Sequence, residues 1–390
     1  MVSLIIHLAF ALSLLATLAS IFYLSFALLC LGRFRHRAER ARTPRTPVTV
    51  FKPVCGIDYG SFDNLRSFCE QDYPDLQVIF GVREADDPVV HVIRRLIETM
   101  PGRDIALVIN DRVIGANLKI SNLVNMYPLA KHDILIIADS DMRVGPDYVS
   151  SVVGAFDAPD VGVVTCLYKA RSAAGVASTL SSMSINEWFL PSALVAVALQ
   201  GPQFCFGSTM AVTRKVLERV GGFEQLGSYL ADDHMLGMLA LRLGYRLRLS
   251  SYVVENVVQE RNLRALFAHE LRWARTIRSI QPWGHAFSFT TYAVPLSMIS
   301  AMLAWPSYEA MTLAGGLLGL CLLLRCAMHR VARSSLGLTG AWSFWLVPVR
   351  DLFGAAVWAA SLFGSRVVWR GWALSVGPKG QLTAKGLSSL

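Results

Sequence analysis

Two carboxylates spaced by one residue follow a strongly apolar stretch of the chain. The stretch is Ile134–Ala138, and Asp139-Ser140-Asp141 comes directly after it. A short apolar run of this kind predicts a buried strand. Carboxylates at the end of a strand can bind a hard divalent cation, Mg²⁺ or Mn²⁺, which could bridge two phosphate oxygens of a leaving diphosphate. The structural alternative is that Asp139 caps the next turn and Asp141 is only solvated.

A second acidic pair, Asp232-Asp233, precedes a helix-like apolar run. One task for such a carboxylate is general base catalysis, in which it takes the proton from an attacking hydroxyl group. Sugar transfer with inversion needs this step while the anomeric carbon separates from phosphate. The other interpretation is a helix N-cap with a favourable contact to the helix dipole.

An arginine and tryptophan cluster, His269-Glu-Leu-Arg272-Trp273-Ala-Arg275, lies shortly before the chain becomes apolar again. Guanidinium groups pair bidentately with phosphate oxygens, and indole offers a flat wall, so the cluster suits a diphosphate leaving group. A basic amphipathic helix with tryptophan at headgroup depth would show the same residues. Both interpretations can hold together.

Two further segments could contact a nucleotide. Arg83-Glu-Ala-Asp86-Asp87-Pro88 follows a predicted strand and could hold a nucleoside by hydrogen bonds, or else form a helix N-cap before Pro88. Lys119 lies at a predicted junction of loop and helix, from which it could reach a nucleotide. A solvated lysine is the commoner explanation of such a position.

Strand-like and helix-like stretches alternate from Val48 to about Gln281, where charged residues are frequent. Helix-like stretches are Pro88–Thr99 and Asn117–Tyr127. The alternation predicts an α/β fold with a mostly parallel sheet covered on both faces, in which ligands bind at the carboxyl ends of the strands. We expect a soluble domain over residues 48–281, with buried strands at Val48–Lys52, Gln77–Val82, Ala106–Asn110, Ile134–Ala138 and Gly162–Thr165.

The composition places part of the chain in lipid. Of 390 residues, 53% are hydrophobic and only 17% are charged, too few charges for an ordinary soluble enzyme. Residues 1–32 contain no Lys, Arg, Asp or Glu, and a helix of that length exceeds the roughly 30 Å hydrocarbon thickness of a bilayer. We expect a transmembrane anchor rather than a cleaved signal peptide, because the basic residues come after the apolar stretch.

A basic juxtamembrane linker is predicted over residues 33–47. By the positive-inside rule its arginines lie in the cytoplasm, which predicts an inner-membrane protein whose next domain faces the cytoplasm. The net charge of +9 is then explained by topology and by attraction to anionic headgroups. No base-reading motif accompanies the arginines, so nucleic-acid binding is not expected. The arginines are Arg33, Arg35, Arg37, Arg40, Arg42 and Arg45.

Membrane segments are predicted again over residues 282–372. Residues 286–305 and 310–324 carry no charge, whereas 342–363 is interrupted by Arg350-Asp351. Two charges facing lipid are costly, so this pair is expected to face protein, water or headgroups, in a segment that spans or is re-entrant. Residues 373–390 are a basic polar tail. The seven cysteines are scattered without a C-x-x-C pair, so neither structural disulfides nor a zinc site is expected.

One segment within the predicted soluble domain, Trp188–Leu199, is almost uncharged. It suits docking against the bilayer surface, where a lipid acceptor would be reached. A plain core helix is the other interpretation.

In this order and in this membrane frame, the motifs resemble glycosyltransferase family 21, the ceramide glucosyltransferases and their bacterial relatives, including hopanoid glycosyltransferases. The resemblance covers nearly the whole chain. It runs from the N-terminal anchor through Phe51–Asp58, Asp72-Tyr-Pro74, Asp86-Asp87-Pro88, Asn117–Leu123, Asp139-Ser140, Gly221-Gly222 and Asp233 to Arg272-Trp273.

The resemblance implies a GT-A fold, a UDP-sugar donor, a divalent cation, and an inverting displacement without a covalent enzyme intermediate. By matching position, Asp87 would contact the nucleoside, Asp139 the metal and diphosphate, and Asp233 would be the base. Arg272 and Trp273 would form the core of the family's Q/R-x-x-R-W diphosphate motif.

Two residues depart from the family pattern. His269 replaces the motif's first Gln or Arg. Its role as a phosphate donor or metal neighbour is open and would vary with pH. The chain has Asp139-Ser-Asp141 where eukaryotic ceramide enzymes tend to have Asp-Ser-Gly, which favours firmer metal binding.

The sequence therefore predicts a membrane enzyme that moves one sugar, glucose or N-acetylglucosamine, from a UDP-sugar to ceramide or to a hopanoid polyol such as bacteriohopanetetrol. One alternative is a processive polysaccharide synthase of the same fold, which needs further spans around a polymer channel. Another is a non-enzymatic membrane scaffold in which the acidic pairs are only helix caps.

Overall fold

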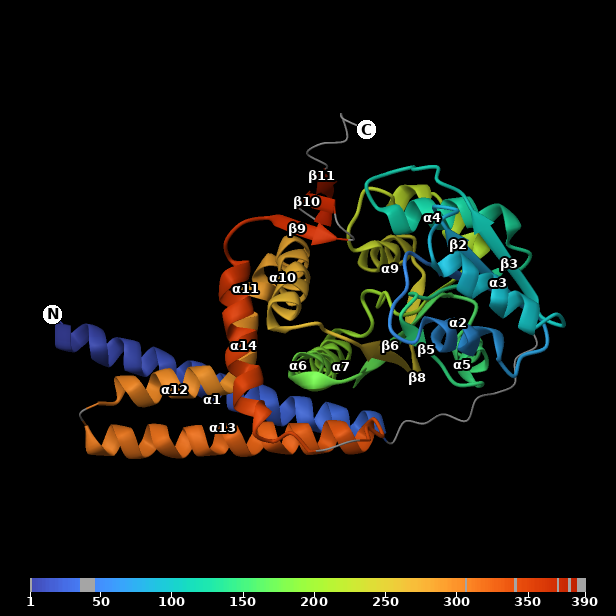
Figure 1. Ribbon diagram of the computed structural model, residues 1–390. Coiled ribbons are helices and arrows are strands. Elements are labelled where there is room, and N and C mark those ends of the chain that lie inside the picture. Colours follow the sequence, from blue (N-terminus) through green and yellow to red (C-terminus); the bar gives the residue numbers. More distant parts are fainter. Residues whose placement is uncertain are drawn as a thin grey trace. The chain divides into compact units, whose positions relative to one another are not determined.

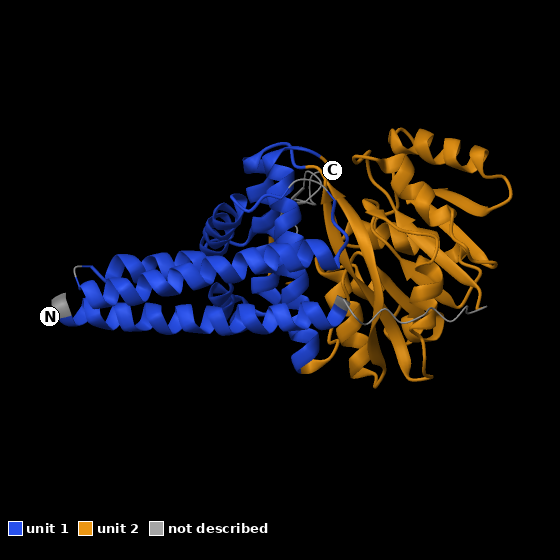
Figure 2. Cartoon of the chain, turned by 90° about the horizontal axis from the view of Figure 1, so that it is seen from below, with its two compact units in different colours: residues 1–37, 174–199, 260–370 blue, residues 38–173, 200–259, 371–390 orange. Residues whose placement is uncertain are grey.

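The computed structural model describes residues 2–35, 46–305, 307–339, 342–369, 372–377 and 380–383. The chain divides into two compact units, of which unit 1 comprises residues 1–37, 174–199 and 260–370, and unit 2 the remainder (Figure 2). Several basic residues lie outside the described residues. They are Arg37, Arg40, Arg42 and Arg45 of the predicted linker, and Arg370, Lys379 and Lys385 near the C-terminus.

A mixed sheet forms the centre of unit 2 (Figure 1). Among the described residues it has eight strands, in the order β3-β2-β1-β4-β7-β6-β8-β5. The first four strands of this order are parallel, whereas β7 runs antiparallel to both β4 and β6. The strands are β1 Val48–Pro53, β2 Leu76–Val82, β3 Asp104–Ile109, β4 Ile134–Ile137, β5 Met142–Arg143, β6 Val161–Ser172, β7 Met210–Thr213 and β8 Arg246–Val258.

The predicted α/β class is confirmed, and each of the five predicted strands is present. The largest difference is β6, which continues to Ser172 although its predicted apolar run ended at Thr165. Beyond that point β6 pairs with β8, for example Lys169 with Glu255. Pairing with a long neighbouring strand therefore extends β6 past its apolar part.

Helices cover both faces of this sheet because alternate strand residues point to opposite sides. Val50 and Phe80 lie in one buried core, whereas Phe51 and Ile79 lie in the other. The first core packs on α2 Ser61–Cys69, α3 Val89–Thr99 and α5 Tyr148–Gly154, and the second on α4 Leu118–Met126, α8 Arg214–Arg219 and α9 Asp232–Arg242. The loops that follow β1, β2 and β4 thus share one edge of the sheet.

Shorter elements complete unit 2. They are the 3₁₀ turns η1 Tyr127–Leu129 and η3 Glu224–Leu226, and a C-terminal antiparallel pair, β10 Trp372–Val376 with β11 Leu382–Thr383.

Among its described residues, unit 1 is helical apart from one short strand. α1 packs along α12 and α13 (Figures 1 and 2). A polar contact between Thr17 and Ser300 hydroxyl groups, 3.1 Å apart, links α1 to α12. The elements are α1 Val2–Arg35, α6 Gly175–Ser184, the π-helical turn η2 Ile185–Phe189, α7 Leu190–Gln200, α10 Leu263–Ile280, α11 Pro282–Phe287, η4 Ser288–Thr291, α12 Ala293–Leu303, α13 Tyr308–Ser335, α14 Leu346–Ser361 and β9 Arg366–Trp369.

Three helices in the described part of the chain are long and apolar enough to cross a bilayer. They are Leu4–Phe34, Gly175–Gln200 and Tyr308–Ser335. A bent pair, Pro282–Thr291 and Ala293–Leu303, makes a fourth if it forms one span, with 66° between its halves. The second of these helices contains Trp188–Leu199, which the sequence suggested for docking at the bilayer surface. The chain thus has the helices of a membrane protein.

The charged pair in α14 faces protein. The Arg350 guanidinium donates to both carboxylate oxygens of Glu270 on α10, at 2.7 Å each. Asp351 accepts a 2.9 Å hydrogen bond from Arg325 on α13. Since all four side chains are buried, each charge has its partner inside the helical unit, which is the condition for keeping ions in an apolar environment.

The buried pair of Glu270 and Arg350 should contribute to the stability of the protein. Glu270→Gln leaves a buried guanidinium without its counter-charge and should lower the free energy of unfolding by about 3–5 kcal/mol. The double variant Glu270→Leu with Arg350→Met should lower the free energy of unfolding by less than the sum of the decreases in the two single variants. Thermal unfolding of the detergent-solubilised protein measures both effects.

A matched control is the exposed pair of Lys131 and Asp104, also 2.7 Å apart. Neutralising Asp104 should change stability by less than about 1 kcal/mol. Equal losses for Glu270→Gln and Asp104→Asn would contradict the role of the buried pair.

Candidate active site

An ammonium group lies between two carboxylates at the carboxyl end of β4. Lys119 Nζ is 2.8 Å from Asp139 Oδ1 and 3.2 Å from Asp232 Oδ2. Asp139 follows β4, Lys119 lies in the first turn of α4, and Asp232 begins α9. Side chains from three separate predicted segments therefore meet at one place.

Asn117 explains why Lys119 and Asp232 meet. Its side-chain oxygen accepts the backbone N–H groups of Lys119 and Ile120, at 3.0 and 3.2 Å, so Asn117 is the N-cap of α4. Its side-chain nitrogen donates to the Tyr229 carbonyl at 2.8 Å and to Asp232 Oδ1 at 3.3 Å. Sequence reasoning gave Asn117 no individual role, although Asn directly before a helix is a recognised N-cap signal.

Asp233 lies in the first turn of α9 but does not cap it. The N-cap position belongs to Ala231, and Asp233 Oδ1 accepts the backbone N–H of His234 at 2.7 Å. Its other oxygen faces Gly207, where an added Cβ atom would lie 3.2 Å from Asp233 Oδ2 and 3.5 Å from Asp139 Oδ2. Both carboxylates thus border one small space, which a side chain at position 207 would fill.

Asp141 points into a second group of polar side chains. Its Oδ2 accepts a 2.9 Å hydrogen bond from Asn256 on β8. Ser140 between the two acids donates to Asp58 Oδ2 at 3.3 Å. Burial, together with the charges of Asp139 and Asp58, raises the pKa of Asp141. A compact group of acids at one strand end carries a high electrostatic cost, and a cation there would relieve it.

A buried lysine that sequence reasoning did not assign supports the loop after β4. Lys52 is fully buried at the end of β1, where its ammonium donates to the Asp139 carbonyl and lies 3.6 Å from the centre of the Phe68 ring. Burial lowers the pKa of Lys52 to about 7, against the opposing effect of Asp141 and Asp139. The sequence signal that could have identified Lys52 is its position as the one charged residue within the otherwise largely apolar strand Val48–Pro53.

The pKa values of the two central groups, Asp233 and Lys119, are both raised, with different consequences for their charge. Burial, reinforced by the neighbouring Asp232 charge, raises the pKa of Asp233 to about 7. Burial alone would lower the pKa of Lys119, but Asp139 and Asp232 outweigh it and raise that pKa. Lys119 is therefore a permanent cation, whereas Asp233 exchanges its proton near neutral pH, as a general base should.

Asp87 lies at the same edge of the sheet, in the loop after β2. One carboxylate oxygen accepts the Gly56 N–H at 2.8 Å, and the other accepts the Val89 N–H at 2.9 Å. Asp87 therefore connects the loop after β1 to the start of α3. Its hydrogen bond to the Val89 N–H resembles the helix N-cap that the sequence offered as the alternative interpretation. Each oxygen keeps a lone pair for a further donor.

The acidic residues fit a divalent cation that is shared with a substrate. Within the described ranges, no group of three or more His, Cys, Asp or Glu is arranged to hold a metal. Mg²⁺ is commonly bound by one or two carboxylates together with substrate phosphates rather than by an all-protein cage. Asp139 and Asp141, separated by one residue, and the space beside Gly207 match that arrangement.

The predicted arginine and tryptophan motif lies on α10 of unit 1. His269 Nδ1 is 2.8 Å from Glu260 Oε1, and its ring centre is 4.5 Å from that of Trp273. Arg275 donates to the carbonyls of Arg366 and Phe363, at 2.5 and 2.8 Å. His269, Arg272 and Trp273 are all half-buried. Within unit 1, then, His269 is engaged by a carboxylate rather than presented as a free donor.

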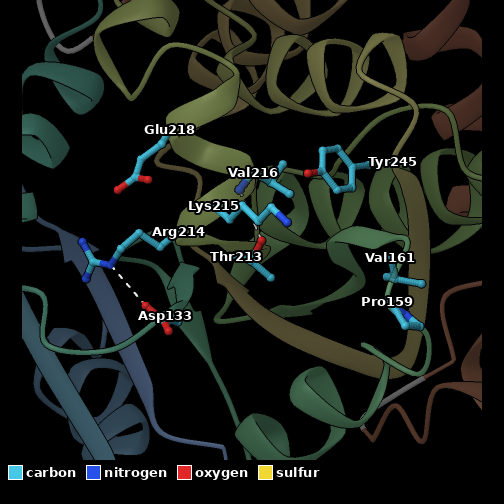
Figure 3. A pocket seen from close by; sticks show the side chains of 9 residues that line it. All are labelled: Asp133, Pro159, Val161, Thr213, Arg214, Lys215, Val216, Glu218 and Tyr245. Atoms are coloured by element: carbon cyan, nitrogen blue, oxygen red, sulfur yellow. Dashed lines mark hydrogen bonds and ion pairs between the residues drawn. The ribbon is translucent and has the colours of Figure 1, made fainter.

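A hollow of about 410 Å³ lies elsewhere in unit 2 (Figure 3). It includes Thr213, which pairs with the first residue of β4, and Val161 at the start of β6. The hollow is therefore at the opposite ends of these strands from Asp139, and none of the predicted site residues lines it. Its lining is Asp133, Pro159, Val161, Thr213, Arg214, Lys215, Val216, Glu218 and Tyr245.

Comparison with protein families and curated proteins points to one group of enzymes. The model of the family described as glycosyl transferase family 21 matches residues 12–382. Ceramide glucosyltransferase 1 of Caenorhabditis elegans is 24% identical over 222 residues, which are 56% of this chain and 47% of that protein. The ceramide glucosyltransferase of Komagataella phaffii is 32% identical over 158 residues, 37% of this chain and 31% of that protein. The matches thus span less than half the length of these relatives.

Among solved structures, a mannosyltransferase from Pyrobaculum calidifontis in complex with GDP-Man and Mn²⁺ resembles this chain with a TM-score of 0.54. The likeness covers 91% of this chain and 99% of that chain at 19% sequence identity. It confirms the expected GT-A fold.

The space beside Gly207 provides a test of the site. Gly207→Ala should place a methyl group against the carboxylates of both Asp139 and Asp233. It should lower the kcat/KM of the enzyme by about tenfold or more, equivalent to ~1.4 kcal/mol. Gly102→Ala is the control, because an added Cβ there has no neighbour within 4 Å. Equal kcat/KM values and melting temperatures for the two variants would show that the space is not used.

Proposed function

Because the chain belongs to glycosyl transferase family 21, we propose that it transfers one sugar from a UDP-sugar to a membrane lipid, with inversion at the anomeric carbon. The observation that carries this proposal is the proximity of the Asp139 and Asp233 carboxylates to the same point, since a Cβ atom added at Gly207 would lie 3.5 Å from Asp139 Oδ2 and 3.2 Å from Asp233 Oδ2. A donor site and a base must be within reach of one reacting carbon, and the closeness of these two carboxylates supports that arrangement.

The donor is held by groups from several loops. Asp139 and Asp141 would hold a divalent cation, Mg²⁺ or Mn²⁺, and Lys119 would contact the diphosphate. The cation, when bound, neutralises charge on the leaving diphosphate. Asp87 would contact the nucleoside, and Arg272 with Trp273 would contact the diphosphate, as the family motif implies. His269, held by Glu260, would orient that motif rather than bind phosphate itself.

Asp233 is the proposed base. A hydroxyl oxygen of the acceptor attacks the anomeric carbon on the face opposite the diphosphate. Its proton passes to Asp233 as the new glycosidic bond forms, and the bond from carbon to phosphate oxygen breaks with its electron pair going to UDP. Asp232 is paired with Lys119 and Asn117 in the free site, so we assign the two neighbouring acids different tasks.

The acceptor is a hydroxylated lipid, either ceramide or a hopanoid polyol such as bacteriohopanetetrol. Support comes from the relatives, which are ceramide glucosyltransferases, and from the apolar helices, which would keep unit 1 in the bilayer. The sugar is glucose or N-acetylglucosamine. The arginines that follow the first apolar segment support a catalytic unit on the cytoplasmic side of an inner membrane.

Asp233→Asn tests the base. With the full chain in nanodiscs, a UDP-sugar and each lipid, mass spectrometry of the wild-type reaction should find lipid carrying one sugar. The variant should lower kcat by about 10²–10⁴-fold, because amide nitrogen cannot accept the proton. Donor affinity should stay within about twofold, since the change does not touch the proposed donor ligands.

Asp157→Asn is the matched control, because Asp157 is an exposed acid paired with Arg248 in the same unit. It should leave kcat unchanged. A polymeric product, or full turnover by Asp233→Asn, would count against the proposed function.

The pKa of Asp233 also predicts a pH profile. Below about 7 the protonated, inactive carboxyl group predominates, so kcat should fall as pH is lowered through about 7 and level off above it. A wild-type profile that stays flat from pH 5 to 8, with chemistry shown to be rate-limiting, would remove Asp233 from this role.

A further inference from the structure

Lys119 is placed where it opposes a divalent cation. Its ammonium lies 2.8 Å from Asp139 Oδ1, the residue proposed as a metal ligand, and its side chain is only 15% exposed. The same group is 3.2 Å from Asp232 Oδ2, whose side chain is 7% exposed. A monovalent cation supplied by the protein is thus paired with the carboxylate that a metal would need.

The backbone keeps Lys119 in this place. The Asn117 side chain accepts a hydrogen bond from the Lys119 backbone N–H and donates one to Asp232. The same amide group thus fixes both the Lys119 backbone and one of the carboxylates that its ammonium contacts. The remaining freedom is in the flexible four-carbon stem of Lys119, which can turn its ammonium toward another anion. A nucleoside diphosphate brings such an anion.

We propose that Lys119 is an internal counter-ion that competes with the divalent cation for Asp139, so that the cation binds tightly only together with the donor diphosphate. Like charges a few ångströms apart repel strongly in a partly buried site. The diphosphate changes this balance because it offers the ammonium a new partner and gives the metal additional oxygen ligands. The inference rests on the proposed role of Asp139 in metal binding, and it makes Lys119 a residue that sets the order of binding.

The test measures metal binding without turnover. Mn²⁺ is titrated into the purified full-length protein, and free Mn²⁺ is followed by electron paramagnetic resonance with and without UDP. Wild type should bind Mn²⁺ weakly alone and at least about tenfold more tightly with UDP. Lys119→Met should bind Mn²⁺ alone about tenfold or more tightly than wild type, because the competing charge is gone.

Three variants serve as controls. Lys119→Arg keeps the charge and should remain as weak as wild type without UDP. Lys131→Met removes an exposed lysine paired with Asp104 and should also match wild type. The double variant Lys119→Met with Asp139→Asn should not show the increased Mn²⁺ affinity of Lys119→Met, because that increase depends on the Asp139 carboxylate.

The outcomes separate this inference from the proposed function. The counter-ion role is overturned if Lys119→Met and wild type bind Mn²⁺ with equal affinity without UDP. Thermal unfolding transitions must show that both proteins are folded. Tight Mn²⁺ binding by wild type without UDP overturns this role too. If Asp139→Asn binds Mn²⁺ in the presence of UDP as tightly as wild type, the metal site itself is wrong, whatever Lys119 does.

Discussion

Mutual repulsion between closely spaced carboxylates is the constraint on which the site in unit 2 depends. Asp139 and Asp141 follow β4, and Asp232 and Asp233 begin α9. Side chains of this kind remain together only when positive charge or hydrogen-bond donors oppose them. Lys119 supplies the charge between the two pairs, and Asn117 fixes both Lys119 and Asp232. Burial, reinforced by the Asp232 charge, raises the pKa of Asp233 to about 7.

Unit 1 meets the same constraint inside apolar helices. The Glu270 and Arg350 pair is bidentate and buried, and a single 2.9 Å hydrogen bond from Arg325 joins it to Asp351, also buried. Such ions are costly in lipid but acceptable when each finds its partner within protein. Glu270 is also part of the segment His269–Trp273, so the pair helps to hold the helix that carries the predicted diphosphate motif. The buried pairs thus link α10 to α14 and α13 to α14 within unit 1.

Much of the fold was predictable because apolar runs and turn residues have strong local patterns. The strands from Val48, Ile134 and the other runs were found where expected, and Asp139 was placed correctly at a strand end. What local patterns do not contain is the partner of each polar group. Lys52 gave no sign of reaching the Asp139 carbonyl, and nothing near Gly207 indicated two distant carboxylates. These contacts arise only when segments far apart in the chain are brought together by the sheet.

The most direct test of the account is the dependence of UDP binding on Mn²⁺, measured by calorimetry with wild type and Asp139→Ala. If the acids after β4 share a cation with the donor diphosphate, Mn²⁺ should raise the affinity of wild type for UDP by about tenfold or more and leave Asp139→Ala nearly unchanged. Equal UDP affinity of wild type with Mn²⁺ and with chelator would contradict the central claim, because the carboxylates would then have no part in holding the donor.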